Sequence, residues 1–187
     1  MEYTKPYRSL FGEDGILEPF AKKIERRLGD MEGFFADEEA YKSLLKEDPL
    51  IYTVYEMPAP AEEGQFSYAT TILYPGKVGE EYFMTKGHYH AKRGTGEIYV
   101  GISGCGVLLM QTQEGEVKSM EIVKGTVAYV PPYWAHRTIN TGGENFVFLA
   151  IYPADASHDY GSIAEEGFAK ILVERDGRPR LIGKDEY

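Results

Sequence analysis

The sequence predicts a mainly β protein, an antiparallel sandwich or barrel preceded by a short helical N-terminal extension. Nine short runs of β-forming residues follow one another between residues 51 and 152. Turn sequences such as Pro75-Gly76 and Gly142-Gly143 separate many of these runs. Many short strands at this spacing are typical of all-β sandwiches and barrels.

The length of the chain favours one domain. Its 187 residues, 43% of them hydrophobic, suffice for one compact core but not clearly for two. We therefore expect a single domain over residues 1–187, in which a helical extension (1–49) precedes a β-barrel core (50–152) and a C-terminal part of strands and loops (153–187).

Two helices are expected in the N-terminal extension. The first is amphipathic, because apolar residues recur at helical spacing between a proline near the start and a glycine just past the end: Leu17, Phe20, Ala21, Ile24 and Leu28, with Pro19 and Gly29. A shorter second helix is capped by Asp37 and ends before Asp48-Pro49, since the residue before a proline resists helical dihedral angles. Its Leu44 and Leu45 are expected to face inward.

From residue 50 the pattern changes to β-strands. In chain order, strands are expected at 51–57, 66–74, 81–85, 97–103, 107–111, 117–123, 127–130, 137–140 and 146–152. One or two more are expected between residues 168 and 182, around Asp176-Gly177.

The pattern His88-Tyr89-His90, with Glu97 seven residues later and His136 further on, predicts a metal site. If residues 88–90 form a strand, both imidazoles point to one face, and neighbouring strands can add a carboxylate and a third imidazole. Three nitrogen ligands and one oxygen ligand suit a first-row divalent ion better than calcium or magnesium, which prefer oxygen alone.

Glycines and prolines around these residues fall into two spaced motifs. The first is His88-x-His90-x6-Glu97-x6-Gly104, and the second is Gly125-x5-Pro131-x-Tyr133-x2-His136-x3-Asn140. Together they resemble the two motifs of the cupin family, small β-barrels that carry a metal between the motif strands. The longer gap before Glu97, and tyrosine where cupins usually have glycine (Tyr82, Tyr133), depart from the common pattern.

These departures point to one branch of cupins. The chain looks like the cupin-type phosphoglucose isomerases of archaea, and the resemblance covers nearly the whole chain. The segments that carry it are 85–90, 97–99, 131–137, 152–155 and 158–161. It implies interconversion of glucose 6-phosphate and fructose 6-phosphate by a homodimer. It also implies one divalent metal ion per subunit, with Fe(II) expected and Ni, Mn, Co or Zn as alternatives, held by His88, His90, Glu97 and His136.

The same resemblance implies roles for further residues. Glu97, Tyr152 and His158 are the expected catalytic residues, with Glu97 as the base and His158 assisting ring opening. The expected substrate-binding residues are Tyr52, Thr71, Thr85, Gly87, Tyr99 and Tyr160. Tyr99 lies two residues beyond Glu97, so an unbroken strand would point both into one cavity, whereas Thr85 shares a face with His88 only if Gly87 introduces a bulge. Lys86 and Arg93 are added to the phosphate site on charge alone.

Alternatives remain open at this point. Coordination weakens Glu97 as a base, so a metal-assisted hydride shift competes with transfer through an enediol. A non-haem iron dioxygenase, a sugar epimerase, or a sugar-binding module without catalysis could carry the same metal motif.

Composition excludes several other classes. The formal charge of -10 argues against binding to nucleic acid or anionic membranes. No apolar run approaches the roughly 20 residues that span a bilayer, and residues 1–6 contain no signal-peptide segment, so a cytoplasmic protein is expected. Two asparagines and three glutamines are few for this length, which is a thermophile bias. Cys105 is the only cysteine, and no role is assigned to it.

Overall fold

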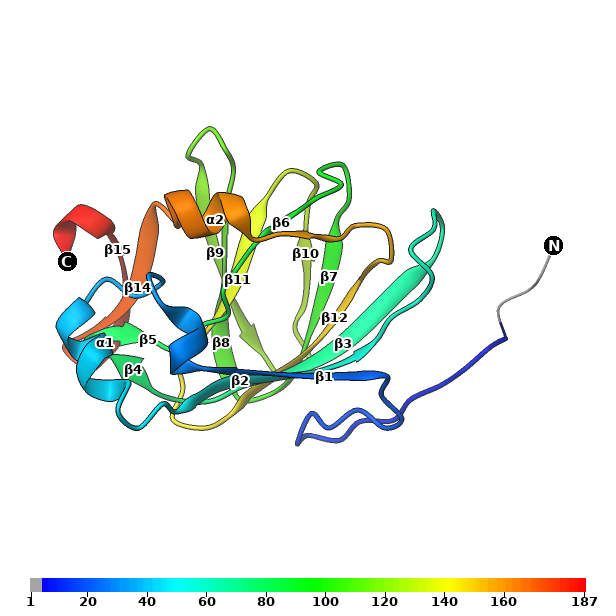
Figure 1. Ribbon diagram of the computed structural model, residues 1–187, viewed down its shortest axis with the longest axis horizontal. Helices are drawn as coiled ribbons and strands as arrows, with labels where there is room; N and C mark the ends of the chain where they lie inside the picture. The colour runs from blue at the N-terminus through cyan, green and yellow to red at the C-terminus, as the bar shows by residue number, and fades with distance from the viewer. Residues whose placement is uncertain (1–4) are drawn as a thin grey trace.

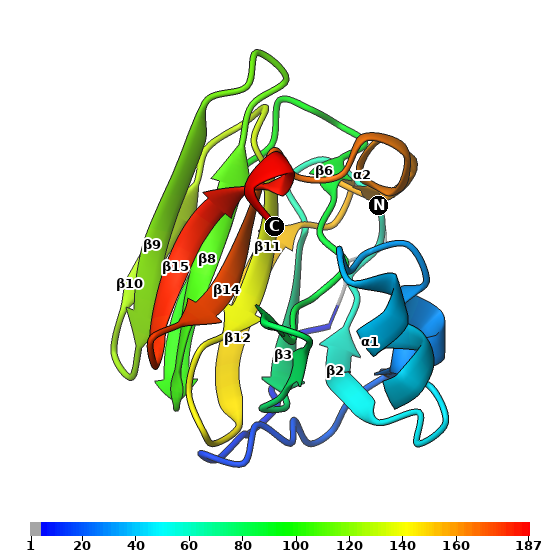
Figure 2. The ribbon, with the colours of Figure 1, turned by 90° about the vertical axis from the view of Figure 1, so that its left-hand side faces the viewer.

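Strand-forming runs separated by glycine turns fold into antiparallel sheets around one interior in the computed structural model, which describes residues 5–187 (Figure 1, Figure 2). Residues 1–4, part of the segment in which no signal peptide is expected, lie outside the described residues. The strands are β1 (Lys22–Arg27), β2 (Leu50–Met57), β3 (Phe66–Leu73), β4 (Lys77–Val78), β5 (Glu81–Tyr82), β6 (Tyr89–His90), β7 (Glu97–Ser103), β8 (Cys105–Gln111), β9 (Val117–Val123), β10 (Val127–Val130), β11 (Ala135–Asn140), β12 (Phe146–Pro153), β13 (His158–Asp159), β14 (Lys170–Arg175) and β15 (Arg178–Gly183).

Four sheets make up the sandwich. The largest has the order β1-β2-β3-β12-β7-β10, and the others are β11-β8-β9, β15-β14-β5-β4 and the short pair β13-β6. Every pairing within them is antiparallel. The predicted mainly β jelly-roll sandwich is therefore confirmed, although within residues 5–187 the sheets do not close into one continuous barrel.

Alternation decides which side chains face the interior. Even-numbered residues of β2 and β12 and odd-numbered residues of β3 and β7 point inward, because adjacent strands are paired in register, for example Phe148 with Thr71 and Ala150 with Tyr99. Fully buried apolar residues such as Leu108, Ile139 and Phe146 form the core beyond the site.

The predicted strands of the core are present, and their bounds mostly agree with the sequence pattern to within two residues. The exception is 81–85, where β5 stops at Tyr82; Met84 then makes an isolated bridge to Ile139, and the Thr85 amide donates to the Thr138 carbonyl. The predicted C-terminal strands are confirmed as the hairpin β14–β15, which turns at Asp176 and Gly177, both with positive φ.

The predicted helix over residues 17–28 is wrong. Residues 22–27 form β1, which pairs with β2 so that Ile24 lies opposite Val54 and Arg26 opposite Tyr52. The open edge of β2 supplies hydrogen-bond partners that outweigh the weak helical pattern. Leu17 instead covers the outer face of the large sheet, and Leu28 begins a 3-10 turn (Leu28–Met31) and packs in the core.

The second predicted helix is confirmed as α1 (Glu38–Leu44), with the Asp37 carboxylate accepting a hydrogen bond from the Ala40 amide at 2.9 Å. Leu44 packs partly buried against the core, but Leu45 is exposed, so its expected inward orientation is wrong. A further helix that the pattern did not predict, α2 (Gly161–Glu166), crosses one edge of the sandwich in Figure 1, and a 3-10 turn (Lys184–Glu186) ends the chain. Among residues 5–187, no helix is long and apolar enough to cross a membrane.

Candidate metal centre and substrate cavity

Four side chains from three separate segments converge on one point inside the sandwich. His88 precedes β6, His90 ends it, Glu97 begins β7 and His136 lies on β11. Each offers one ligand atom, and these four atoms lie within 4.8 Å of one another. Two backbone hydrogen bonds between His88 and His136, of 3.2 and 3.0 Å, bring the first motif against the second.

Hydrogen bonds on the far side of two imidazoles fix which nitrogen faces the centre. Nδ1 of His90 lies 3.1 Å from the Thr95 carbonyl oxygen, and Nδ1 of His136 lies 3.4 Å from the Trp134 carbonyl oxygen. Because a carbonyl can only accept, each Nδ1 carries a hydrogen, so in the neutral imidazole each Nε2 keeps the lone pair with which it could bind an ion. This arrangement is the usual one for histidines that bind metals.

The centre has the polar imbalance that a cation would relieve. Nε2 of His90 and Nε2 of His136 lie 3.0 and 2.9 Å from the same Glu97 oxygen, Oε2. With both lone pairs turned inward, three electron-rich atoms meet in a buried space. Nε2 of His88 and Nε2 of His136 are also buried without any hydrogen-bond partner among the described residues. Such orphaned nitrogens are costly unless an ion binds them, so the residues present fit a divalent metal.

Glu97 is the negative charge of this centre. Burial alone would raise the pKa of its carboxyl group, but positive charge beside it, from protonated imidazoles of His136 and His90 or from a cation that replaces their protons, outweighs burial and lowers this pKa below its usual range. Burial also lowers the pKa of His88 well below its usual value. An anionic carboxylate among neutral imidazoles is the protonation state in which these groups bind metal.

A cavity opens from this centre to the surface. The inward-facing residues of β1, β2, β3, β7, β11 and β12, together with the segments 85–88 and 158–160, line it: Ile24, Arg26, Tyr52, Val54, Glu56, Ala69, Thr71, Thr85, Lys86, Gly87, His88, Glu97, Tyr99, His136, Thr138, Phe148, Ala150, Tyr152, His158 and Tyr160. The structure thus brings all the residues expected to bind substrate, and the three expected to act in catalysis, to one cavity.

The expected residues occupy different depths. Tyr99 and Tyr152 are buried, and burial raises the pKa of each hydroxyl group above its usual value. His158 and Tyr160 lie at the mouth, where the His158 ring is 4.4 Å from the His88 ring and 5.6 Å from the Tyr160 ring, centroid to centroid. Desolvation lowers the pKa of His158, which keeps the imidazole neutral at pH 7.

The irregular backbone at Gly87 reconciles Thr85 with His88. Gly87 has a φ of 75°, a conformation that only glycine adopts without strain. Thr85 and His88 consequently both line the cavity, although their spacing in a regular strand would point them to opposite faces. The Thr85 hydroxyl accepts a hydrogen bond from the Thr138 amide at 3.0 Å, which fixes its position.

Two cations lie at the cavity without an acidic partner. Arg26 and Lys86 both line it, and neither forms an ion pair with a carboxylate of residues 5–187. Arg93, the other residue added on charge alone, does not line the cavity. Its guanidinium binds Asp159 at 2.8 Å and stacks on the Tyr89 ring at 3.9 Å.

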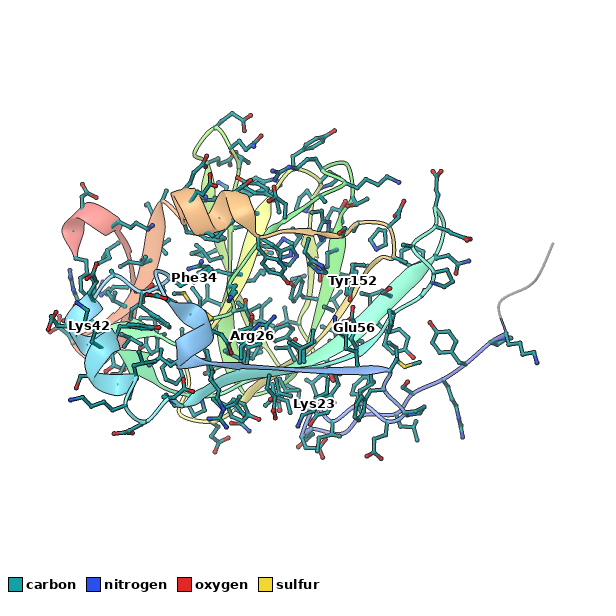
Figure 3. All side chains as sticks on the ribbon, viewed as in Figure 1. Lys23, Arg26, Phe34, Lys42, Glu56 and Tyr152 are labelled. Carbon is teal, nitrogen blue, oxygen red and sulfur yellow. The ribbon has the colours of Figure 1, made fainter. Side chains whose placement is uncertain are left out.

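Sequence reasoning missed Arg26 and Glu56. Arg26 was hidden because residues 17–28 were expected to be helical, yet the alternation of exposed and half-buried side chains along β1 is the signal that could have found it. Figure 3 shows Arg26 on the inner side of β1 and Lys23 on the outer side. Glu56 is the penultimate residue of β2, and its inward parity with Tyr52 was the available signal.

An antiparallel jelly roll with three histidines and one glutamate gathered between its two motif segments defines a metal-binding cupin. A family model described as glucose-6-phosphate isomerase (GPI) matches residues 25–186, and the chain belongs to that family.

Relatives match most or all of the chain. The glucose-6-phosphate isomerase of Thermococcus kodakarensis is 57% identical, with 100% of this chain and 99% of the relative covered. That of Sinorhizobium medicae is 42% identical over 87% of this chain and 77% of the relative. Among solved structures, the formate complex of Lactobacillus farciminis oxalate decarboxylase has 18% identity and a TM-score of 0.47, and the match covers 58% of this chain and 30% of that one.

Proposed function

We propose that this protein interconverts glucose 6-phosphate and fructose 6-phosphate with one divalent metal ion per subunit. The observation that carries the proposal is the convergence of His88, His90, Glu97 and His136 at the base of an open cavity in a chain of this family. Fe(II) is the expected ion, with Ni, Mn, Co and Zn as alternatives. A cytoplasmic homodimer remains a prediction from the resemblance.

When bound, the ion would polarise the sugar carbonyl and stabilise negative charge that develops on the sugar oxygens. The protein's own contribution starts with Glu97. Both short contacts to the histidines involve Oε2, which leaves Oε1 as the oxygen that takes a proton from the sugar carbon. If the hydrogen moves as a hydride instead, Glu97 serves as ligand and orienting charge only.

Residues at the mouth prepare the substrate. His158 is neutral and can accept a proton from the C1 hydroxyl, which assists opening of the sugar ring. Tyr99 lines the buried part of the cavity, where its hydroxyl can hold a sugar oxygen.

The phosphate is assigned to the part of the cavity that Arg26 and Lys86 line. Neutral donors there are the hydroxyl groups of Tyr52, Thr71, Thr85 and Tyr160 and the backbone of Gly87. Arg26 and Lys86 supply the positive charge that a protein of net charge -10 needs locally to attract a dianion.

Removing the metal is expected to abolish the isomerase activity. The loss should be at least about 100-fold, since metal-ion catalysis supplies several kcal/mol of transition-state stabilisation. A coupled assay for fructose 6-phosphate, before and after chelation, measures it. Fe(II), Ni or Mn should restore activity, whereas Mg or Ca should not, because they prefer oxygen ligands. Full activity in the chelated protein would contradict the metal's role.

Replacing Arg26 by glutamine is expected to raise KM for glucose 6-phosphate by about 10-fold with little change in kcat, because a charged hydrogen bond to the phosphate contributes about 1.5–3 kcal/mol. The inhibition constant of inorganic phosphate should rise in parallel. Lys23→Gln is the matched control, since it removes the same charge from the outer side of the same strand (Figure 3). Equal effects of the two substitutions would show that Arg26 acts only through net charge.

A further inference from the structure

A second carboxylate faces the cavity from β2, which lies in the same sheet as β7, the strand of Glu97. Glu56, on β2, lines the cavity, and its side chain is only 16% exposed. Its Oε1 lies 2.6 Å from the Tyr152 hydroxyl oxygen on β12, whereas its Oε2 lies 3.9 Å from Nζ of the exposed Lys22. The strong partner of Glu56 is therefore a tyrosine inside the cavity, and Figure 3 shows the two residues side by side.

The direction of this hydrogen bond determines what Tyr152 can offer a substrate. A carboxylate can only accept, so the Tyr152 hydroxyl donates its hydrogen to Glu56, and the lone pairs of its oxygen remain free. Burial, and next the hydrogen bond to Glu56, raise the pKa of the Tyr152 hydroxyl, so the phenol stays protonated. Tyr152 thus presents an acceptor to the cavity and can pass a proton on, but it is not itself a base.

The proposed reaction requires such an acceptor. Converting an aldose into a ketose removes the proton from O2 and adds one to O1, whether the carbon-bound hydrogen moves as a proton or as a hydride. Glu97 can account for the carbon-bound hydrogen only. Another group must take the hydroxyl proton and return it.

We propose that Glu56 is a positioning residue that acts through Tyr152 as the reservoir for this hydroxyl proton. The O2–H bond breaks as the proton moves to the Tyr152 oxygen, and the original Tyr152 O–H bond breaks as its proton moves to the Glu56 carboxylate. The reverse transfers deliver a proton to O1 and restore both side chains. No oxidant or further reactant is needed. The inference rests on the proposed isomerase function and holds for either route of the carbon-bound hydrogen.

Glu56→Gln tests the relay, because glutamine keeps the shape and an oxygen acceptor but cannot take up a proton. We expect kcat to fall by about 100-fold, as is typical when a proton-transfer group is lost, with KM within about twofold of the wild type. Tyr152→Phe should lose a similar factor, and the double variant should be no worse than the poorer single variant, because both changes break one pathway. Glu25→Gln, on the outer side of β1, is the matched control and should keep full activity.

Chemical rescue separates proton transfer from a structural role. Formate should raise kcat of Glu56→Ala by at least about 10-fold, since general acid–base groups contribute this much or more, and should leave Tyr152→Phe unchanged. Four results would each overturn the relay. They are wild-type kcat in Glu56→Gln, a loss in Glu56→Gln that is confined to KM, additive losses in the double variant, and no rescue of Glu56→Ala by formate. A wild-type protein without isomerase activity would instead overturn the proposed function itself.

Discussion

Replacing Glu97 by glutamine is expected to lower kcat by about 10²- to 10⁴-fold, the range typical for removing a general base, while the protein keeps part of its metal. Glutamine preserves the volume of the buried side chain and an oxygen ligand between His90 and His136. It removes the negative charge that balances a cation in this enclosed space, so metal binds more weakly. It also removes the carboxylate that we propose as the acceptor of the carbon-bound proton.

The measurement must separate occupancy from chemistry. Metal content and kcat are determined on the same samples, and kcat is expressed per bound ion at saturating metal. Glu121→Gln makes the same chemical change on an exposed strand position and should leave both quantities unchanged. Normal turnover per bound ion in Glu97→Gln would remove Glu97 from proton transfer and favour a hydride shift.

The grouping of the candidate ligands was largely predictable because three of the four are close in sequence. His88 and His90 are two residues apart, so alternation puts both imidazoles on one face, and Glu97 begins the next strand only seven residues later. His136 comes from a distant part of the chain. Its place beside the other three ligands was predicted only because the spacing of the second motif resembles that of cupins. The tautomers that Thr95 and Trp134 impose on His90 and His136 could not be predicted, because they depend on backbone carbonyls placed by the turns.

The substrate end of the cavity was less accessible to sequence reasoning. The sequence of residues 22–27 fits a helix and a strand about equally well. Only hydrogen bonding to the unpaired edge of β2 makes this segment a strand. The hydrogen bond between Glu56 and Tyr152 joins residues 96 positions apart and depends on β2 and β12 both pairing with β3. Charge alone suggested Arg93, yet tertiary contacts commit that residue to Asp159. Local patterns therefore predicted the strands of the core, whereas the pairing of distant strands determined which charges reach the cavity.

Gly87→Ala is expected to be the most damaging small substitution near the site. A Cβ atom there would lie 2.8 Å from the Phe168 ring and 3.0 Å from Cβ of Arg137, and Gly87 has a φ of 75°. Backbone strain of about 1–2 kcal/mol and overpacking of about 1–3 kcal/mol together suggest a loss near 3 kcal/mol. For a chain of this size, that loss corresponds to a melting temperature lower by about 6–12 °C.

The same change should weaken the metal centre, because the residues on either side of Gly87 are fixed. The Lys86 carbonyl accepts a hydrogen bond from the buried Arg137 at 2.7 Å, and His88 is bridged to His136, so a shift at Gly87 moves His88 away from its partners. Metal affinity should fall by about 10- to 100-fold, as when a ligand loses its supporting contacts. Gly64→Ala is the matched control: its φ of 85° imposes similar strain, but no atom lies within 4 Å of the added methyl group. Thermal unfolding and metal titration of both variants isolate the effect of crowding. Equal losses of stability and metal affinity in the two variants would contradict the role of close packing against Phe168 and Arg137. Backbone strain alone would then explain the need for glycine at position 87.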